Sequence, residues 1–129
     1  MFTLDQIKAA HAQVKSGADF PQYIRDLKAM GVAGYDTFVL DGHAVFVGKD
    51  DYSVSSEAKY PPVHISPESN ADQFAQYLKS HQQGQTDYLR FCGHAAESGV
   101  HKWTVDIAAM TCTYFDTRGN LMLSEPIPS

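Results

Sequence analysis

The sequence has few cysteines and no long apolar run, which argues against a disulfide-rich protein and against a membrane-spanning one. The 129 residues include two cysteines, Cys92 and Cys112, with no CxxC spacing, so neither a disulfide framework nor a cysteine-rich zinc site is expected. Both thiols should be reduced and buried. No window approaches the roughly 18 apolar residues of a membrane span, and residues 1–6 lack the basic and apolar regions of a signal peptide. We expect a soluble, cytoplasmic protein with no membrane partner.

Basic residues are also few. Ten Lys and Arg stand against fifteen Asp and Glu, which gives a formal net charge of -5 at pH 7, and the cations are scattered along the chain. Phosphate neutralisation supplies most of the non-specific affinity of proteins for nucleic acid, so such a surface repels it. No nucleic-acid partner is expected.

The remaining composition is that of an ordinary globular protein. Hydrophobic residues make up 43% and charged residues 19% of the chain, which excludes a largely disordered protein. A chain of 129 residues is long enough for one core and short for two. We therefore expect a single domain over residues 1–129.

The first half of the sequence predicts two helices and a hairpin. Thr3 and Gln6 have the spacing of a capping box, and the apolar period that follows ends at Ser16-Gly17. Asp19 is placed to cap a second helix that ends at Gly31. From residue 34 the period changes to two, and Asp41-Gly42 is a two-residue turn signal of type I′ between strands at 35–40 and 43–47.

The second half predicts the same order of elements. Residues 48–62 are mostly irregular, with a short strand at 52–55 as an alternative, and a short strand is expected at 63–65. Asn70 or Ser69 can cap a third helix and Thr86 a fourth, which Gly99 ends. Strands are predicted at 102–107, 111–115 and 121–125.

An internal duplication is suggested by residues that match in character 68 positions apart. The matched pairs are Phe20 and Tyr88, Tyr23 and Phe91, Gly31 and Gly99, Val32 and Val100, and Tyr35 and Trp103. We therefore hypothesise two repeats, residues 1–65 and 66–129. Because hairpin signals alternate with helix pairs, the expected fold is α+β, with two layers: helices on one face of a mainly antiparallel sheet of about five to seven strands. Trp103, which alternates with Val105 and Ile107, should be a core anchor.

Four segments of the chain resemble a family of small bacterial proteins of similar length that carries the label "phage envelope protein". These segments are Gly34–Phe38, Asp41–His43, Glu97–Asp106 and Met110–Asp116. The resemblance extends over nearly the whole chain. It implies an association with phage-derived genes, and it brings with it no activity, substrate, cofactor or catalytic residue.

The histidines and cysteines do not have the spacing of a metal or catalytic site. The six histidines contain no HxH or HExxH pattern, so no metal ligand set is indicated and no cofactor is expected. His11 and His81 occupy similar places on the first helix of each half, where packing between helices accounts for them. Cys92 and His94 are two residues apart on a predicted helix and face apart, which disfavours a Cys–His pair.

Two groups of polar residues are the candidate sites. Asp41 and His43 lie at a predicted hairpin tip, where the Asp-Gly turn itself accounts for them. Lys102, Thr104 and Asp106 form a polar strand face that is solvated unless residues 48–62 cover it. Covered in this way, the face would become a cleft. The ligand-binding candidates are then His43, Tyr52, Tyr60, Lys102 and Asp106.

These patterns favour a domain that binds a ligand or a protein partner without catalysis. The sequence has no recognisable nucleophile–base spacing and no phosphate-binding glycine loop, whereas 7 Tyr, 7 Phe and 1 Trp provide aromatic contact surface. One alternative is a hydrolase- or isomerase-like enzyme that uses Asp106 with a histidine. A second alternative is a phage-related structural subunit. The oligomeric state is not indicated.

Overall fold

The computed structural model describes residues 2–14 and 19–127. Within them the chain forms two helices and three strands, and then the same series again. The helices are α1 (Leu4–His11), α2 (Phe20–Met30), α3 (Ala71–Gln82) and α4 (Tyr88–Glu97), and the strands are β1 (Gly34–Phe38), β2 (Ala44–Val47), β3 (Ser53–Ser55), β4 (Val100–Asp106), β5 (Thr111–Asp116) and β6 (Leu121–Pro126). No helix among these has the length and apolar character needed to cross a membrane.

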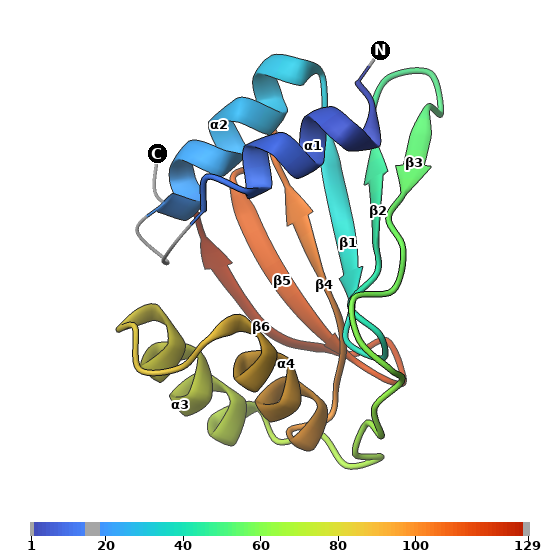
Figure 1. Ribbon diagram of the computed structural model, residues 1–129. Coiled ribbons are helices and arrows are strands. Elements are labelled where there is room, and N and C mark those ends of the chain that lie inside the picture. Colours follow the sequence, from blue (N-terminus) through green and yellow to red (C-terminus); the bar gives the residue numbers. More distant parts are fainter. Residues whose placement is uncertain (1, 15–18, 128–129) are drawn as a thin grey trace.

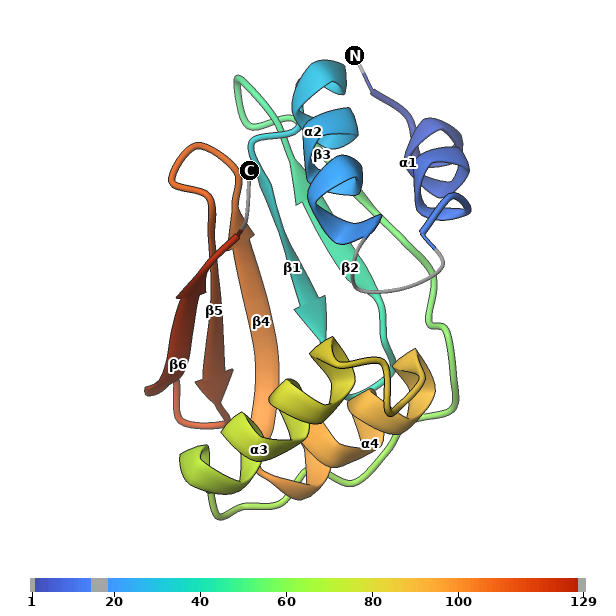
Figure 2. The same ribbon diagram turned by 90° about the vertical axis from the view of Figure 1, so that its left-hand side faces the viewer.

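The described strands form one antiparallel sheet in the order β3-β2-β1-β4-β5-β6. The first strand of each half, β1 and β4, therefore lies in the middle, with Asp36 opposite Thr104. The α1–α2 pair covers one end of the sheet and the α3–α4 pair the other, on the same face (Figures 1 and 2). This arrangement confirms the predicted α+β fold with helices packed against an antiparallel sheet.

The core lies between the sheet and the helices because strand residues alternate in burial. On β4, Trp103 and Val105 are buried, while Asp106 is exposed on the other face. Trp103 is 8% exposed and packs against Phe91 and Tyr114, with ring centroids 5.8 and 5.9 Å away. The prediction that Trp103 is a core anchor is confirmed.

The helix ends follow the sequence with one correction. Thr3 and Gln6 form both hydrogen bonds of the capping box, and Asn70 caps α3. The predicted cap of α4 at Thr86 is wrong. Asp87 takes this place, since its carboxylate accepts the Arg90 N–H, while Thr86 contacts the His81 ring. The predicted end of the first helix at residues 16 and 17 lies outside the described residues.

Gly31 and Gly99 both follow their helices with left-handed backbone, at φ 98° and 87°, as predicted. Gly99 is needed for a second reason. A Cβ there would lie 2.6 Å from the Glu68 carbonyl oxygen, so no side chain fits without a shift of the backbone.

Three predictions about the middle of the chain need correction. The first hairpin does not close with a two-residue turn: residues 39–43 connect β1 to β2, and Gly42 alone in that connection has positive φ, whereas a type I′ turn needs two. The segment 53–55 is strand β3, the alternative considered for that region. The predicted strand at 63–65 does not form, because Val63 makes a single backbone bond, to Leu40, and joins no ladder.

The internal duplication stays a prediction. α2 and α4 begin at Phe20 and Tyr88, and β3 and β6 begin at Ser53 and Leu121, each pair 68 residues apart. Asp36 and Thr104, also 68 apart, face each other across the centre of the sheet. Superposition of residues 1–65 on 66–129 tests the hypothesis.

His11 and His81 pack between helices, as predicted. The His11 ring meets Tyr23 edge-on at 5.3 Å, and His81 stacks on Phe91 at 4.4 Å. Burial lowers the pKa of both imidazoles, and at His11 the charge of Lys59 adds to this effect.

Truncation of Trp103 to Ala should lower the free energy of unfolding by about 3–5 kcal/mol, because it removes a large buried aromatic and leaves a cavity. Urea denaturation followed by circular dichroism measures this loss. An unchanged midpoint in the Trp103→Ala protein would contradict the assignment of Trp103 to the core.

The free energy of unfolding should fall as the pH drops from 7 to 5. The folded chain holds His11 and His81 with lowered pKa values, so the unfolded chain binds more protons below about pH 6.5. Urea denaturation at both pH values checks the direction. The doubly substituted His11→Gln/His81→Gln protein should show a smaller pH dependence than the parent; equal or greater stability of the parent at pH 5 would contradict the argument.

Candidate functional site

The structure brings two of the five candidate residues together, on the sheet face away from the helices. His43 stacks on Phe38 with ring centroids 4.5 Å apart, and Lys102 Nζ lies 5.9 Å from the same ring. Lys102 also lies 3.7 Å from an Asp36 carboxylate oxygen. Asp41 pairs with the His43 ring, and this hydrogen bond lowers the pKa of the Asp41 carboxyl. The charges and hydrogen-bonding groups of these side chains are therefore paired with one another on an open surface.

Asp106 lies apart from this group. Asp106 is opposite Gly34, whereas Lys102 is opposite Phe38, so the two lie at different ends of the paired strands. The Asp106 carboxylate is exposed and accepts the Ala109 N–H in the following turn. Neither of the two cavities described below is lined by Asp106 or Lys102.

The two tyrosines of the 48–62 segment have separate structural roles. Tyr52 donates its hydroxyl to the Phe2 carbonyl and packs edge-on against the Phe2 ring, 4.9 Å between centroids. Tyr60 donates to the Val39 carbonyl at 2.6 Å. Tyr52 therefore fixes the chain near its beginning, and Tyr60 fixes the segment that runs from β3 to α3.

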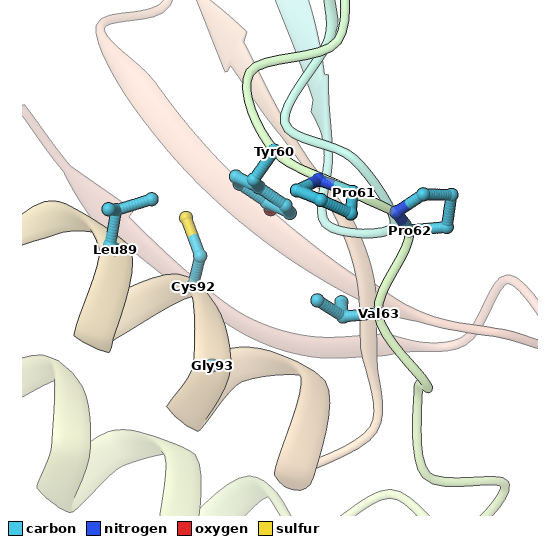
Figure 3. A pocket seen from close by; sticks show the side chains of 7 residues that line it. All are labelled: Tyr60, Pro61, Pro62, Val63, Leu89, Cys92 and Gly93. Atoms are coloured by element: carbon cyan, nitrogen blue, oxygen red, sulfur yellow. The ribbon is translucent and has the colours of Figure 1, made fainter.

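A surface groove lies where this segment passes α4. It has a volume of about 360 Å³ and is mainly apolar. Figure 3 shows the segment on one side and α4 on the other, with the Tyr60 ring and the Cys92 sulfur pointing toward the space between them. The lining residues are Tyr60, Pro61, Pro62, Val63, Leu89, Cys92 and Gly93. We call it the Tyr60–Cys92 groove.

The segment wall of the groove is held by backbone hydrogen bonds to the β1–β2 connection. The N–H groups of Lys59 and Tyr60 both donate to the Asp41 carbonyl, and the Val63 N–H donates to the Leu40 carbonyl at 2.8 Å. Between these anchors stand Pro61 and Pro62, which fix φ and have no N–H to satisfy. The wall is therefore rigid without pairing into the sheet.

The α4 wall of the groove has one large exposed side chain, Leu89, and one glycine, Gly93. Leu89 is 63% exposed although it is apolar. Gly93 lies inside α4, and a Cβ built on it would meet no atom within 4 Å. Glycine in a helix interior costs stability relative to alanine, and here its absent side chain leaves the groove open.

The Cys92 thiol at the floor is a poor nucleophile. It is 2% exposed, and burial raises its pKa. The thiol therefore stays protonated at neutral pH. His94 stacks on Tyr77, with centroids 3.9 Å apart. His94 thus packs against α3, whereas the Cys92 side chain lines the groove.

Sequence reasoning found Tyr60 and missed the other groove residues as a site. In the sequence, Leu89 and Gly93 were the two residues that could have indicated the groove. Leu89 is a large apolar residue off the buried stripe of α4, and Gly93 interrupts a helix without ending it. Pro61, Pro62 and Val63 gave no such indication, because their contact with α4 depends on the tertiary path of the chain.

Comparison with known proteins identifies the family of the chain. Residues 8–126 match the family model described as "Protein of unknown function (DUF1398)". No protein among the curated sequences matches. The match begins within α1 and ends with β6, so it includes the Tyr60–Cys92 groove. Since it extends over nearly the whole length, the chain belongs to the DUF1398 family of proteins of unknown function.

Proposed function

We propose that this protein is a non-enzymatic domain that binds a small, neutral, flat apolar molecule in the Tyr60–Cys92 groove. The observation that carries the proposal is the groove itself, an apolar hollow of about 360 Å³ open at the surface. Ligand sites are typically concave, mainly apolar and few in a protein.

Hydrogen bonds hold the segment wall of the groove in place. The Asp41 carbonyl accepts two N–H groups of the segment, and Tyr60 is tied to the Val39 carbonyl. A wall held in this way loses little conformational entropy on binding. The rigidity of this wall favours a preformed ligand site. A segment that folds only when it binds a partner would not be anchored in this way.

The chemistry of the lining indicates a neutral ligand. The Tyr60 hydroxyl is already used as a donor, the Cys92 thiol is protonated, and the prolines offer no N–H. What remains is aliphatic surface and the face of an aromatic ring, which suits a flat apolar molecule. The volume has room for on the order of ten non-hydrogen atoms, if each takes about the 30 Å³ of a liquid water.

The two alternative functions have less support. An enzyme that uses Asp106 with a histidine needs the two side chains in contact. Among the described residues, the carboxylate that pairs with a histidine is that of Asp41, with His43. For a phage-related structural subunit, the exposed Leu89 would contact another copy or another protein. Light scattering at increasing concentration separates a monomeric ligand-binding domain from a self-associating subunit.

Gly93→Ala should raise the free energy of unfolding by about 0.5–1 kcal/mol, because alanine is the better residue in a helix interior. The added methyl group meets no atom within 4 Å, so no clash opposes this gain. Thermal and urea denaturation measure it. A less stable Gly93→Ala protein would show that the helix wall is more crowded than the structure indicates.

Gly93→Leu should fold stably and lose ligand binding, because its longer side chain fills the groove from the helix wall. Indole, which is neutral and flat, serves as the probe, and nuclear magnetic resonance titration of labelled protein measures its affinity. We expect indole to perturb residues on both walls, with binding at least about tenfold weaker in Gly93→Leu.

Gly93→Ala is the matched control, since it changes the same position and leaves most of the groove empty. It should bind indole within about twofold of the parent. Equal indole affinity in the Leu and Ala variants, or no indole binding to the parent protein, would contradict the proposal.

A further inference from the structure

A second cavity lies on the other side of the same segment, between α1, α2 and β2. Its volume is about 230 Å³. Lys59 lines it, whereas the next residue, Tyr60, lines the Tyr60–Cys92 groove. The residues around it are Leu4, Ile7, Lys8, His11, Ala12, Tyr23, Phe46, Ser56 and Lys59. We call it the basic cavity.

Three of the nine lining residues are basic, and none is acidic. Lys8 and His11 come from one turn of α1, and Lys59 reaches the cavity from the segment after β3. All three basic residues are exposed at the rim of the cavity. Partial burial and then the charge of Lys8 lower the pKa of Lys59, and partial burial and then the charge of Lys59 lower the pKa of His11. In a chain of net charge -5, this is a local concentration of positive charge.

Among the described residues, no carboxylate forms an ion pair with the lysines of the cavity. Over the described ranges 2–14 and 19–127, the ion pairs are Asp41 with His43 and Asp36 with Lys102. Neither Lys8 nor Lys59 takes part in one. Like charges held together without a counter-charge lower stability, and an anion between them would remove this repulsion.

The cavity also offers hydroxyls and an apolar floor. Ser56 and Tyr23 line it beside the cations. Ile7, Tyr23 and Phe46 are each 5% exposed or less and form buried apolar surface. Leu4 and Ala12 add more accessible apolar surface to the lining. A bare inorganic anion would leave this surface uncovered, so the lining matches a molecule with an anionic head and a small apolar body.

We propose that the basic cavity is a second binding site, distinct from the Tyr60–Cys92 groove, for a small organic carboxylate whose anionic head lies among Lys8, His11 and Lys59. The apolar body of the ligand lies against Ile7 and Phe46. The proposal does not depend on the function assigned to the groove, since no residue lines both cavities.

Protonation of His11 should strengthen binding. The groups that face the His11 imidazole are Lys59 from the segment after β3, Tyr23 from α2 and Lys8 from its own helix. Burial and the charge of Lys59 lower the pKa of His11, and a bound carboxylate opposes both effects. His11 therefore takes up a proton on binding, and the affinity for a carboxylate rises as the pH falls from about 7.5 to 6. A carboxylic acid, with a pKa of about 4, remains ionised over this range.

Calorimetric titration of the full chain with benzoate tests the proposal, with benzyl alcohol as the neutral analogue and inorganic phosphate as the anion without an apolar body. We expect benzoate to bind at least about tenfold more tightly than either. Affinity should fall with added salt and rise from pH 7.5 to pH 6, and His11→Gln should remove the pH dependence.

Lys59→Met and Lys8→Met keep an apolar stem and remove one charge each. Each should weaken benzoate binding about tenfold, and Lys59→Met should melt no lower than the parent because it relieves repulsion. Lys79→Met, on the exposed face of α3, and Gly93→Leu are controls that should bind benzoate like the parent. Unchanged affinity in both cavity variants, or equal binding of phosphate or benzyl alcohol, would overturn the proposal.

Discussion

The pairing of β1 with β4 is the interaction on which the rest of the structure depends. It joins the two halves of the chain in the middle of the sheet, with Thr37 opposite Trp103 and Tyr35 opposite Val105. Side chains alternate between the faces of a strand, so a slip of one residue would turn Trp103 toward solvent. The observed register places the buried residues of both halves on one face, and that face is large enough to be covered by two helix pairs.

The segment after β3 is the second constraint, and it creates both candidate sites. It leaves the sheet at Ser55 and is held by the carbonyls of Asp41 and Leu40 while it passes the helices. Because it is anchored by its backbone, its side chains are free to line two different spaces. Lys59 is on one side, among cations and a buried apolar floor, and Tyr60 is on the other, beside the Cys92 thiol. An apolar groove and a basic cavity thus share one wall.

Much of the fold could be predicted because it depends on local signals. The capping box at Thr3, the left-handed glycines Gly31 and Gly99 and the alternation around Trp103 each act within a few residues. The error at the first hairpin occurred where a distant contact changed the local preference. Asp41-Gly42 is a strong two-residue turn signal, yet the Asp41 carbonyl binds the 59–60 segment and the connection widens to residues 39–43.

The sequence by itself determined the α+β class, the order of the four helices and of five of the six described strands, and the burial of Trp103, since period, caps and turn residues act locally. Only the tertiary structure decided where sites form. Tyr60 and Leu89 are far apart in sequence, as are Lys8 and Lys59, and each pair meets because the segment after β3 crosses between the helix pairs. The predicted cleft at Lys102 and Asp106 failed to gather its five candidates for the same reason: β3 joins the sheet edge beside β2, and the chain then runs to the helix side.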